Sequence, residues 1–257
     1  MTGQACGTAP VAVQQQVTEC IRVLQQLVGP DLVGMYLFGS LAMGCFNPRS
    51  SDIDLLIVTN EGLMAETKRR IAESLLRLSN APAPIEVTFL AHESLQHWRH
   101  PSPYDFHFSE DWRGKHEQIL QRGEWRCWQG TQGEDSHVAV SVTVARERGI
   151  TLLGSSAHVT LPQVPERDFV AAILADHRWV RERMNQLPAY AVLNHCRTLA
   201  YLREKRVLSK TAGGAWALTT LPEAYHDLVA QALAEYGGGQ RKAFDTERLA
   251  QFLDNVR

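Results

Sequence analysis

The fold is decided by the stretch Leu37-Phe38-Gly39-Ser40, followed by Gly44 and then by Ser51-Asp52-Ile53-Asp54-Leu55-Leu56-Ile57-Val58. An apolar strand leads into a Gly-Ser turn that opens a helix, and a second strand begins with two alternating acids. Because side chains along a strand alternate between its two faces, we expect Asp52 and Asp54 to point the same way. The sequence therefore predicts that two carboxylates converge beside a glycine turn.

These groups suit a metal-bound triphosphate. Mg²⁺ is usually held by one or two carboxylates together with substrate phosphates, which is the role expected for Asp52 and Asp54. Gly39 lets the backbone come close to a phosphate, and Ser40 adds a hydroxyl at a helix start, whose free N–H groups attract anions. Each half alone could be an ordinary turn or a solvated strand end, but their order on adjoining strands favours a nucleotide site.

A third carboxylate occurs in the next strand-like run, residues 84–90. Glu86, Thr88 and Leu90 share one face of this strand, and the opposite face is apolar. Glu86 is expected to be either a general base for an acceptor hydroxyl or a third metal ligand. The alternative is that Glu86 lies on a solvated edge strand, where charges are tolerated.

The string G-S-x-x-x-G followed by S-D-I-D-L-L resembles the signature of the DNA polymerase β-like nucleotidyltransferase superfamily. That resemblance implies transfer of a nucleoside monophosphate from a nucleoside triphosphate to an acceptor. The motif is specific for the superfamily and says little about the acceptor.

Further runs are similar to those of aminoglycoside 3''-adenylyltransferases, the spectinomycin and streptomycin resistance enzymes. The similar runs keep their order and approximate spacing over nearly the whole chain: residues 108–113, 135–154, 164–168 and 192–197, then Ser209-Lys210, Trp216-Ala217 and Leu221-Pro222. The resemblance implies an α+β protein, in which a nucleotidyltransferase domain with a mixed sheet precedes an α-helical bundle. It also implies an active site in the cleft between the two.

By position, the resemblance assigns a role to each candidate residue. Asp52 and Asp54 would hold two Mg²⁺ ions and Glu86 would be the catalytic base. The nucleotide-binding residues implied for ATP, the co-substrate, are Gly39, Ser40, Ser51, Lys210 and Tyr236.

The resemblance also implies an acceptor site with an aromatic platform. Trp112 and Trp179 would pack on a cationic, ring-rich drug. Streptomycin-modifying relatives grip the drug with acids in the loop that follows Trp179, but here residues 180–190 hold one acid, Glu182, beside Arg181 and Arg183. Arginines repel a dication, so spectinomycin is favoured over streptomycin.

Composition bounds the other function classes. The 257 residues carry a formal net charge of -2, which argues against a broad nucleic-acid surface. Five scattered cysteines show no zinc spacing and are expected to be reduced thiols, and no apolar run is long enough to span a membrane. We therefore expect a cytoplasmic monomer that binds a small-molecule antibiotic, with neither nucleic acid nor a membrane as partner.

Hydrophobic spacing predicts the organisation of the chain. Apolar residues recur at helical intervals over 13–28 and 63–78, on either side of the acidic strand, and residues 138–149 are expected to form another helix. The prolines at 162 and 165 mark a linker. We therefore predict a nucleotidyltransferase domain over residues 1–161 and a helical domain over residues 162–257.

The predicted function is transfer of AMP from Mg-ATP to an antibiotic hydroxyl, with release of pyrophosphate. One alternative is a nucleotidyltransferase that acts on another small molecule or, like an AMPylating antitoxin, on a protein; such antitoxins are usually short single-domain chains. Another is a nucleotide-binding module without catalysis. Retention of Asp52, Asp54 and Glu86 together argues against that module.

Overall fold

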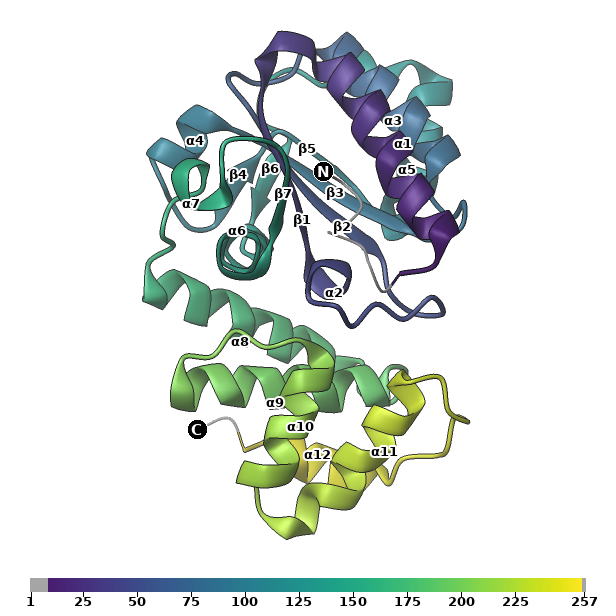
Figure 1. The fold of residues 1–257 in the computed structure, drawn as a ribbon, viewed down its shortest axis with the longest axis vertical. Coiled ribbons are helices and arrows are strands. Elements are labelled where there is room, and N and C mark those ends of the chain that lie inside the picture. Colours follow the sequence, from purple (N-terminus) through teal and green to yellow (C-terminus); the bar gives the residue numbers. More distant parts are fainter. Residues whose placement is uncertain (1–8, 256–257) are drawn as a thin grey trace. The chain divides into compact units, whose positions relative to one another are not determined.

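The computed structural model describes residues 9–255, and the chain divides into two compact units, Met1–Asp168 and Phe169–Arg257 (Figure 1). The first unit contains a mixed sheet with helices and the second is helical, which confirms the predicted α+β class. The two units divide between Asp168 and Phe169, inside a helix. The sequence suggests a domain boundary slightly earlier, after residue 161, and that boundary stays a prediction.

The first unit contains strands and helices interspersed along the chain. Its elements are α1 (Val11–Val28), η1 (Gly29–Asp31), β1 (Leu32–Phe38), α2 (Gly39–Ala42), β2 (Ile53–Thr59), α3 (Ala65–Leu78), β3 (Ile85–Ala91), α4 (His92–Gln96), β4 (Ser102–Tyr104), β5 (Phe106–Phe108), η2 (Glu110–Trp112), α5 (Arg113–Arg122), η3 (Glu124–Cys127), β6 (Gly133–Asp135), α6 (His137–Arg148), β7 (Ile150–Gly154) and α7 (Ala157–Thr160). The helices predicted over 13–28, 63–78 and 138–149 and the strand predicted over 84–90 correspond to α1, α3, α6 and β3.

The main sheet has the strand order β5-β3-β2-β1-β7, and β4 pairs with β6 in a second, small sheet. Only β2 and β3 of the main sheet run parallel; the other neighbours are antiparallel. A parallel pair needs a crossover connection, which α3 supplies here. The crossover brings the starts of β2 and β3 to the same end of the sheet.

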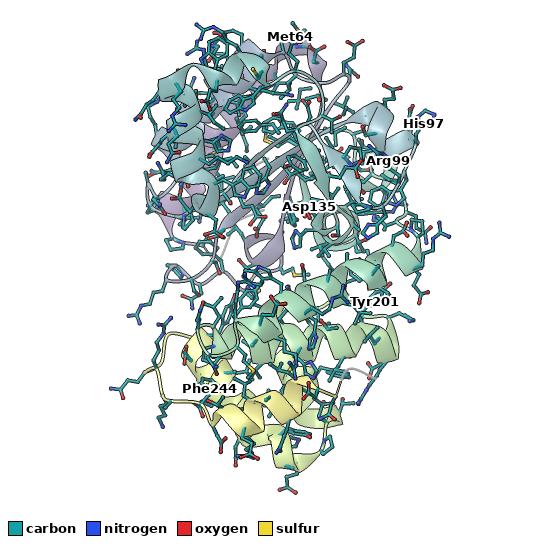
Figure 2. The ribbon with its side chains drawn as sticks, turned by 180° about the vertical axis from the view of Figure 1, so that it is seen from behind. Met64, His97, Arg99, Asp135, Tyr201 and Phe244 are labelled. Atoms are coloured by element: carbon teal, nitrogen blue, oxygen red, sulfur yellow. The ribbon has the colours of Figure 1, made fainter. Side chains whose placement is uncertain are left out.

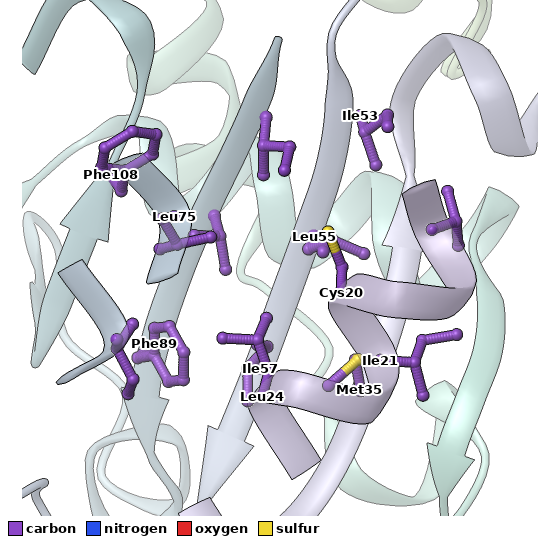
Figure 3. Close-up of a cluster of buried hydrophobic side chains, with 14 of the residues drawn as sticks. Cys20, Ile21, Leu24, Met35, Ile53, Leu55, Ile57, Leu75, Phe89 and Phe108 are labelled. Carbon is purple, nitrogen blue, oxygen red and sulfur yellow. The ribbon is translucent and has the colours of Figure 1, made fainter. Parts of the chain in front are cut away.

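The alternation of side chains along the strands gives the sheet two buried faces. One face packs against α1 and α3, where Ile21, Leu55 and Phe89 belong to a large apolar cluster (Figure 3). The opposite face carries a second cluster with α6 and α7, which includes Leu56 and Val142. Asp54 and Glu86 lie in register with this second face, at its end.

A buried ion pair joins two segments of the first unit. Lys68, on α3, has no solvent exposure and donates to Asp105 Oδ1 at 2.7 Å and to the Gly130 carbonyl at 2.7 Å. The second carboxylate oxygen of Asp105 accepts the Leu63 N–H at 2.6 Å. This network ties α3 to the segment that joins β4 and β5.

The second unit begins within α8 and consists of packed helices. Its elements are α8 (Glu166–Glu182), α9 (Pro188–Glu204), α10 (Lys210–Thr220), η4 (Glu223–Tyr225), α11 (His226–Tyr236) and α12 (Thr246–Leu253). Helix α9 is buried on most of its surface and contributes Ala191, Val192, Leu193 and Cys196 to the core of this unit.

The sequence predicts reduced cysteines and no membrane-spanning segment. Cys20, Cys45, Cys127 and Cys196 are free thiols, and Cys6 lies outside the described residues. Among residues 9–255, no helix combines the length and apolar character needed to cross a membrane.

Candidate active site

The starts of β2 and β3 bring two of the three predicted acids together. Asp54 and Glu86 are Cα partners in the parallel pair, so their side chains stand side by side on the same face. Asp52 comes one residue before β2, not inside the strand, although strand alternation predicts an in-strand position. It still lies close enough to influence the Glu86 carboxyl electrostatically.

Gly39 is shaped to fit against this acid pair. Its φ is +67°, and a Cβ at residue 39 would lie 1.8 Å from Asp54 Oδ2, so only glycine fits. Phe38 is the β1 partner of Asp54, which explains why the turn directly after β1 reaches the carboxylate. The buried Ser40 Oγ has no hydrogen-bond partner among the described residues, which leaves it available to a ligand. The nearby Ser51 Oγ is buried and accepts the Asn47 N–H at 3.0 Å.

The environment of Glu86 favours the neutral carboxyl. Burial raises the pKa of Glu86 above its usual range; nearby His137 opposes the shift, and the negative charges of Asp52, Asp135 and Asp111 add to it. Asp135 is the last residue of β6 (Figure 2), and its Oδ1 accepts the His137 N–H at 2.8 Å. Sequence reasoning missed Asp111, Asp135 and His137 as site residues, although two of the runs that resemble the adenylyltransferases contain them.

The position of β3 excludes one interpretation of Glu86. Strand β3 lies between β2 and β5, so it is not an edge strand. Pairing with β5 starts at Val87, opposite Phe108, so the sheet narrows beside Glu86. The chain leaving β5 continues into η2, which explains how Asp111 comes near the acid.

Trp112, the predicted acceptor contact in the first unit, is held by its neighbours. Its ring meets the imidazole of His107 edge-on at 5.4 Å between centroids. The His107 Nδ1 lies 3.0 Å from Thr88 Oγ1. Thr88 pairs with His107 and lies on the same strand and the same face as Glu86. Lys115 Nζ lies 3.9 Å from the centroid of the Trp112 ring and covers one of its faces.

In the second unit, the structure brings two predicted nucleotide contacts together. Lys210 is the first residue of α10, and its Nζ lies 5.7 Å from the ring centroid of Tyr236, the last residue of α11. Tyr190, which sequence reasoning did not select, lies closer, with its centroid 4.2 Å from the same Nζ.

The predicted acceptor contacts of the second unit lie at the end of α8. Trp179 is 45% exposed, and the Arg183 guanidinium carbon lies 4.4 Å from its ring centroid. Glu182 is within 3.4 Å of Arg183, and Arg181 donates from Nε to Asp254 Oδ1 at 2.8 Å. All three charged residues of this segment are thus engaged within their own unit.

No group of three or more His, Cys, Asp or Glu residues in the described part of the chain is arranged to hold a metal ion. The donor set nevertheless suits Mg²⁺ delivered with a nucleotide, because Asp52 and Asp54 supply hard carboxylate oxygens and phosphates supply the rest. Burial is the main cause of the raised pKa of Glu86, and the smaller contributions of Asp52, Asp135 and Asp111 come from negative charge near this carboxyl, which a cation would neutralise.

Comparison with known proteins assigns both units. Residues 17–101 match the model of the nucleotidyltransferase domain, and residues 160–257 match that of the aminoglycoside adenylyltransferase C-terminal domain. Together these matches cover more than two thirds of the chain and carry both expected domains in order. The chain belongs to the aminoglycoside adenylyltransferase family. This adenylyltransferase is therefore a nucleotidyltransferase, as the signature around Gly39 and Asp54 predicts.

Curated relatives resemble the adenylyltransferase over almost its full length. An aminoglycoside (3'') (9) adenylyltransferase of Klebsiella pneumoniae is 26% identical, with 95% of this chain and 94% of the relative covered. A spectinomycin 9-adenylyltransferase of Staphylococcus aureus is also 26% identical, over 88% of this chain and 86% of its own length.

A solved structure shares the fold. The crystal structure of the spectinomycin adenyltransferase AAD(9) from Enterococcus faecialis, with ATP and spectinomycin, superposes with a TM-score of 0.77 at 19% identity. The match covers 93% of this chain and 96% of that one.

Proposed function

We propose that this adenylyltransferase transfers AMP from Mg-ATP to a hydroxyl of an aminocyclitol or aminoglycoside antibiotic and releases pyrophosphate. The observation that carries the proposal is the register of β2 and β3, which places Asp54 directly beside Glu86 and next to the Gly39 turn. The names of the relatives, and the ATP and spectinomycin in the related crystal structure, support the same substrates.

Glu86 acts as the general base in this proposal. Its carboxylate accepts the proton of the acceptor hydroxyl while the hydroxyl oxygen attacks the α-phosphorus of ATP. The new bond joins the hydroxyl oxygen to the α-phosphorus. The bond between the α-phosphorus and the oxygen that bridges it to the β-phosphate breaks, so pyrophosphate leaves with that oxygen and the electron pair. A base with a raised pKa holds the abstracted proton better than an ordinary carboxylate does.

The proposed nucleotide contacts are those expected from the sequence. Gly39 and Ser40 contact the triphosphate, Ser51 lines the nucleotide, and Lys210 with Tyr236 contact ATP from the helical unit. The unpartnered Ser40 Oγ supports its role, because a phosphate oxygen would satisfy it. Asp52 and Asp54 would hold Mg²⁺, and the sequence leads us to expect two ions. When bound, Mg²⁺ would neutralise the charge of the phosphates.

Spectinomycin is the favoured acceptor, with Trp112, Trp179 and Glu182 as contacts. The preference over streptomycin rests on the single acid, Glu182, in the segment that follows Trp179. The guanidinium of Arg183 covers the Trp179 ring, and the same residue pairs with Glu182. A cationic acceptor would have to displace Arg183 before it could use either group.

The deciding experiment is pyrophosphate release from Mg-ATP by the purified protein, with spectinomycin and streptomycin supplied separately. The proposal expects release with spectinomycin and much less with streptomycin. Equal release with both would remove the preference, and release with neither would remove the antibiotic as acceptor.

Controls separate transfer from simple hydrolysis of ATP. ATP without an acceptor measures hydrolysis, and Glu86→Gln measures residual transfer without the base. Mass spectrometry of the drug should show the addition of one AMP group. The protein is expected to be active as a monomer in the cytoplasm. Size-exclusion chromatography with light scattering measures its oligomeric state.

A further inference from the structure

Lys210 contacts two tyrosine rings in the helical unit. Its Nζ is 4.2 Å from the ring centroid of Tyr190, at the start of α9, and 5.7 Å from that of Tyr236, at the end of α11. Both tyrosines are partly buried and pack on the apolar core of the unit. The rings are therefore anchored to the core while their faces meet the ammonium.

The position of Lys210 is locally unfavourable without such a partner. It is the first residue of α10, where the helix dipole and the free N–H groups repel a positive charge. Ser209 caps this helix by accepting the Ala212 N–H at 3.1 Å. An aromatic face attracts an ammonium group, so Tyr190 offsets the repulsion and restricts the side chain to one direction.

Two glycines allow this arrangement, since α10 must lie close to both α9 and α11. A Cβ on Gly213 would lie 3.0 Å from the Arg197 backbone N of α9. A Cβ on Gly214 would lie 2.6 Å from Leu233 Cδ2 of α11 and 2.9 Å from Leu193 Cδ2 of α9. Glycine is a poor helix former, and the close approach of three helices explains its presence in α10.

We infer that Tyr190 is a positioning residue for nucleotide binding, which holds the Lys210 ammonium in the orientation that meets the ATP triphosphate. This inference rests on the proposed role of Lys210 as an ATP contact. Tyr190 need not touch the nucleotide. Its ring fixes a long, flexible side chain before ATP arrives, so less conformational entropy is lost on binding.

The test is a double-mutant cycle on Mg-ATP affinity, measured by isothermal titration calorimetry without acceptor. Tyr190→Leu keeps an apolar side chain against the core but removes the ring, and Lys210→Gln removes the charge. Tyr190→Leu should weaken ATP binding by about 3- to 30-fold, the range expected for a cation–π contact, and Lys210→Gln should weaken it at least as much, because it also removes the charge that meets the triphosphate. The double variant should be no weaker than Lys210→Gln alone, because both changes remove the same interaction.

Conservative and matched variants distinguish positioning from packing. Tyr190→Phe retains the aromatic face and should restore most of the affinity lost in Tyr190→Leu. Lys205→Gln is the charge-matched control: Lys205 lies over Tyr201, labelled in Figure 2, at 5.5 Å in the same unit, and its loss should leave ATP affinity unchanged. Thermal melts of all variants check that the helical unit remains folded.

The outcomes separate this inference from the proposed function. If Lys210→Gln weakens ATP binding and Tyr190→Leu does not, or if the two effects are additive, the positioning role is wrong. If Lys210→Gln has no effect, the proposed ATP contact is wrong and the inference falls with it. If the cycle behaves as expected but no antibiotic receives AMP, the inference stands and only the acceptor must be replaced.

Discussion

The Cα of Gly39 faces the carboxylate of Asp54 so closely that a methyl group at residue 39 would lie 1.8 Å from Oδ2. The turn and the acid occupy one small volume at the end of the sheet. Any side chain at residue 39 must move the carboxylate or the turn, and both moves would disturb the proposed metal and nucleotide site.

We expect Gly39→Ala to lower adenylyl transfer by about 100-fold or more, because displacement of a reacting group by about 1 Å has costs of that size. Steady-state pyrophosphate release measures the loss. Gly44→Ala is a control for backbone strain alone, since Gly44 also has a positive φ of +70° but its Cβ position has no atom of the described part of the chain within 4 Å. Comparable losses in both variants would show that strain, and not Asp54, is responsible.

The raised pKa of Glu86 predicts the acid limb of the pH–rate profile. A base must be deprotonated to act, so kcat should rise with pH above the range of an ordinary carboxyl group. Asp135→Asn removes an anion that raises this pKa and should shift the limb toward lower pH. His137→Gln removes an opposing group and should shift the limb the other way. Shifts of the same sign in both variants would contradict this electrostatic arrangement.

The buried histidine pair of the helical unit predicts loss of stability in acid. His177 Nε2 and His195 Nδ1 are 2.9 Å apart, and burial lowers the pKa of His195 to about 3. The folded state therefore binds fewer protons than the unfolded state between the usual histidine pKa near 6.5 and about 3. Stability should be fully present above this window and fall as the pH falls through it.

Chemical denaturation at a series of pH values from about 7.5 to about 4 measures this dependence. The limits lie above the ordinary pKa of histidine and near those of the carboxylates. In His195→Gln the slope of stability against pH should be smaller than in the unmodified protein. An unchanged slope would assign the acid sensitivity to other groups.

The buried ion pair predicts a large and specific stability loss. Lys68→Met should destabilise the protein by about 3–5 kcal/mol, because among residues 9–255 the Asp105 carboxylate would keep only the Leu63 N–H as its hydrogen-bond partner. The double variant Lys68→Met/Asp105→Asn should recover part of the loss, since no unpaired charge is then buried. Urea unfolding of the single and double variants measures both effects, and a double variant no more stable than Lys68→Met would refute the explanation.

Much of the first unit could be predicted from sequence because its main elements carry strong local periodicity. The alternation around Asp54 and Glu86 predicts two strands with a common polar end, and helical spacing predicts α1 and α3. Glycine at residue 39 predicts the turn, whereas its contact with Asp54 depends on the β1–β2 register, which no local pattern specifies.

Other site features depend on contacts between distant segments. Strands β4, β5 and β6 have three residues each, too short for a periodic signal, yet they determine where His107 and Asp135 lie. Pro101 and Pro103 are residue types typical of turns, yet Ser102 begins β4. The contact between Tyr190 and Lys210 requires α9 and α10 to pack together, which spacing within one helix cannot indicate.

The single parallel pairing in the sheet has a consequence for the order of folding. The β1–β2 hairpin can form from one local segment, and it already contains Gly39 and Asp54. Glu86 joins them only after α3 has crossed over and β3 has docked, a contact between residues far apart in the chain. A nascent or partly unfolded chain would thus contain the proposed phosphate-binding turn before the base is in place. We therefore expect AMP transfer to be gained after phosphate binding during folding, and to be lost before it during unfolding.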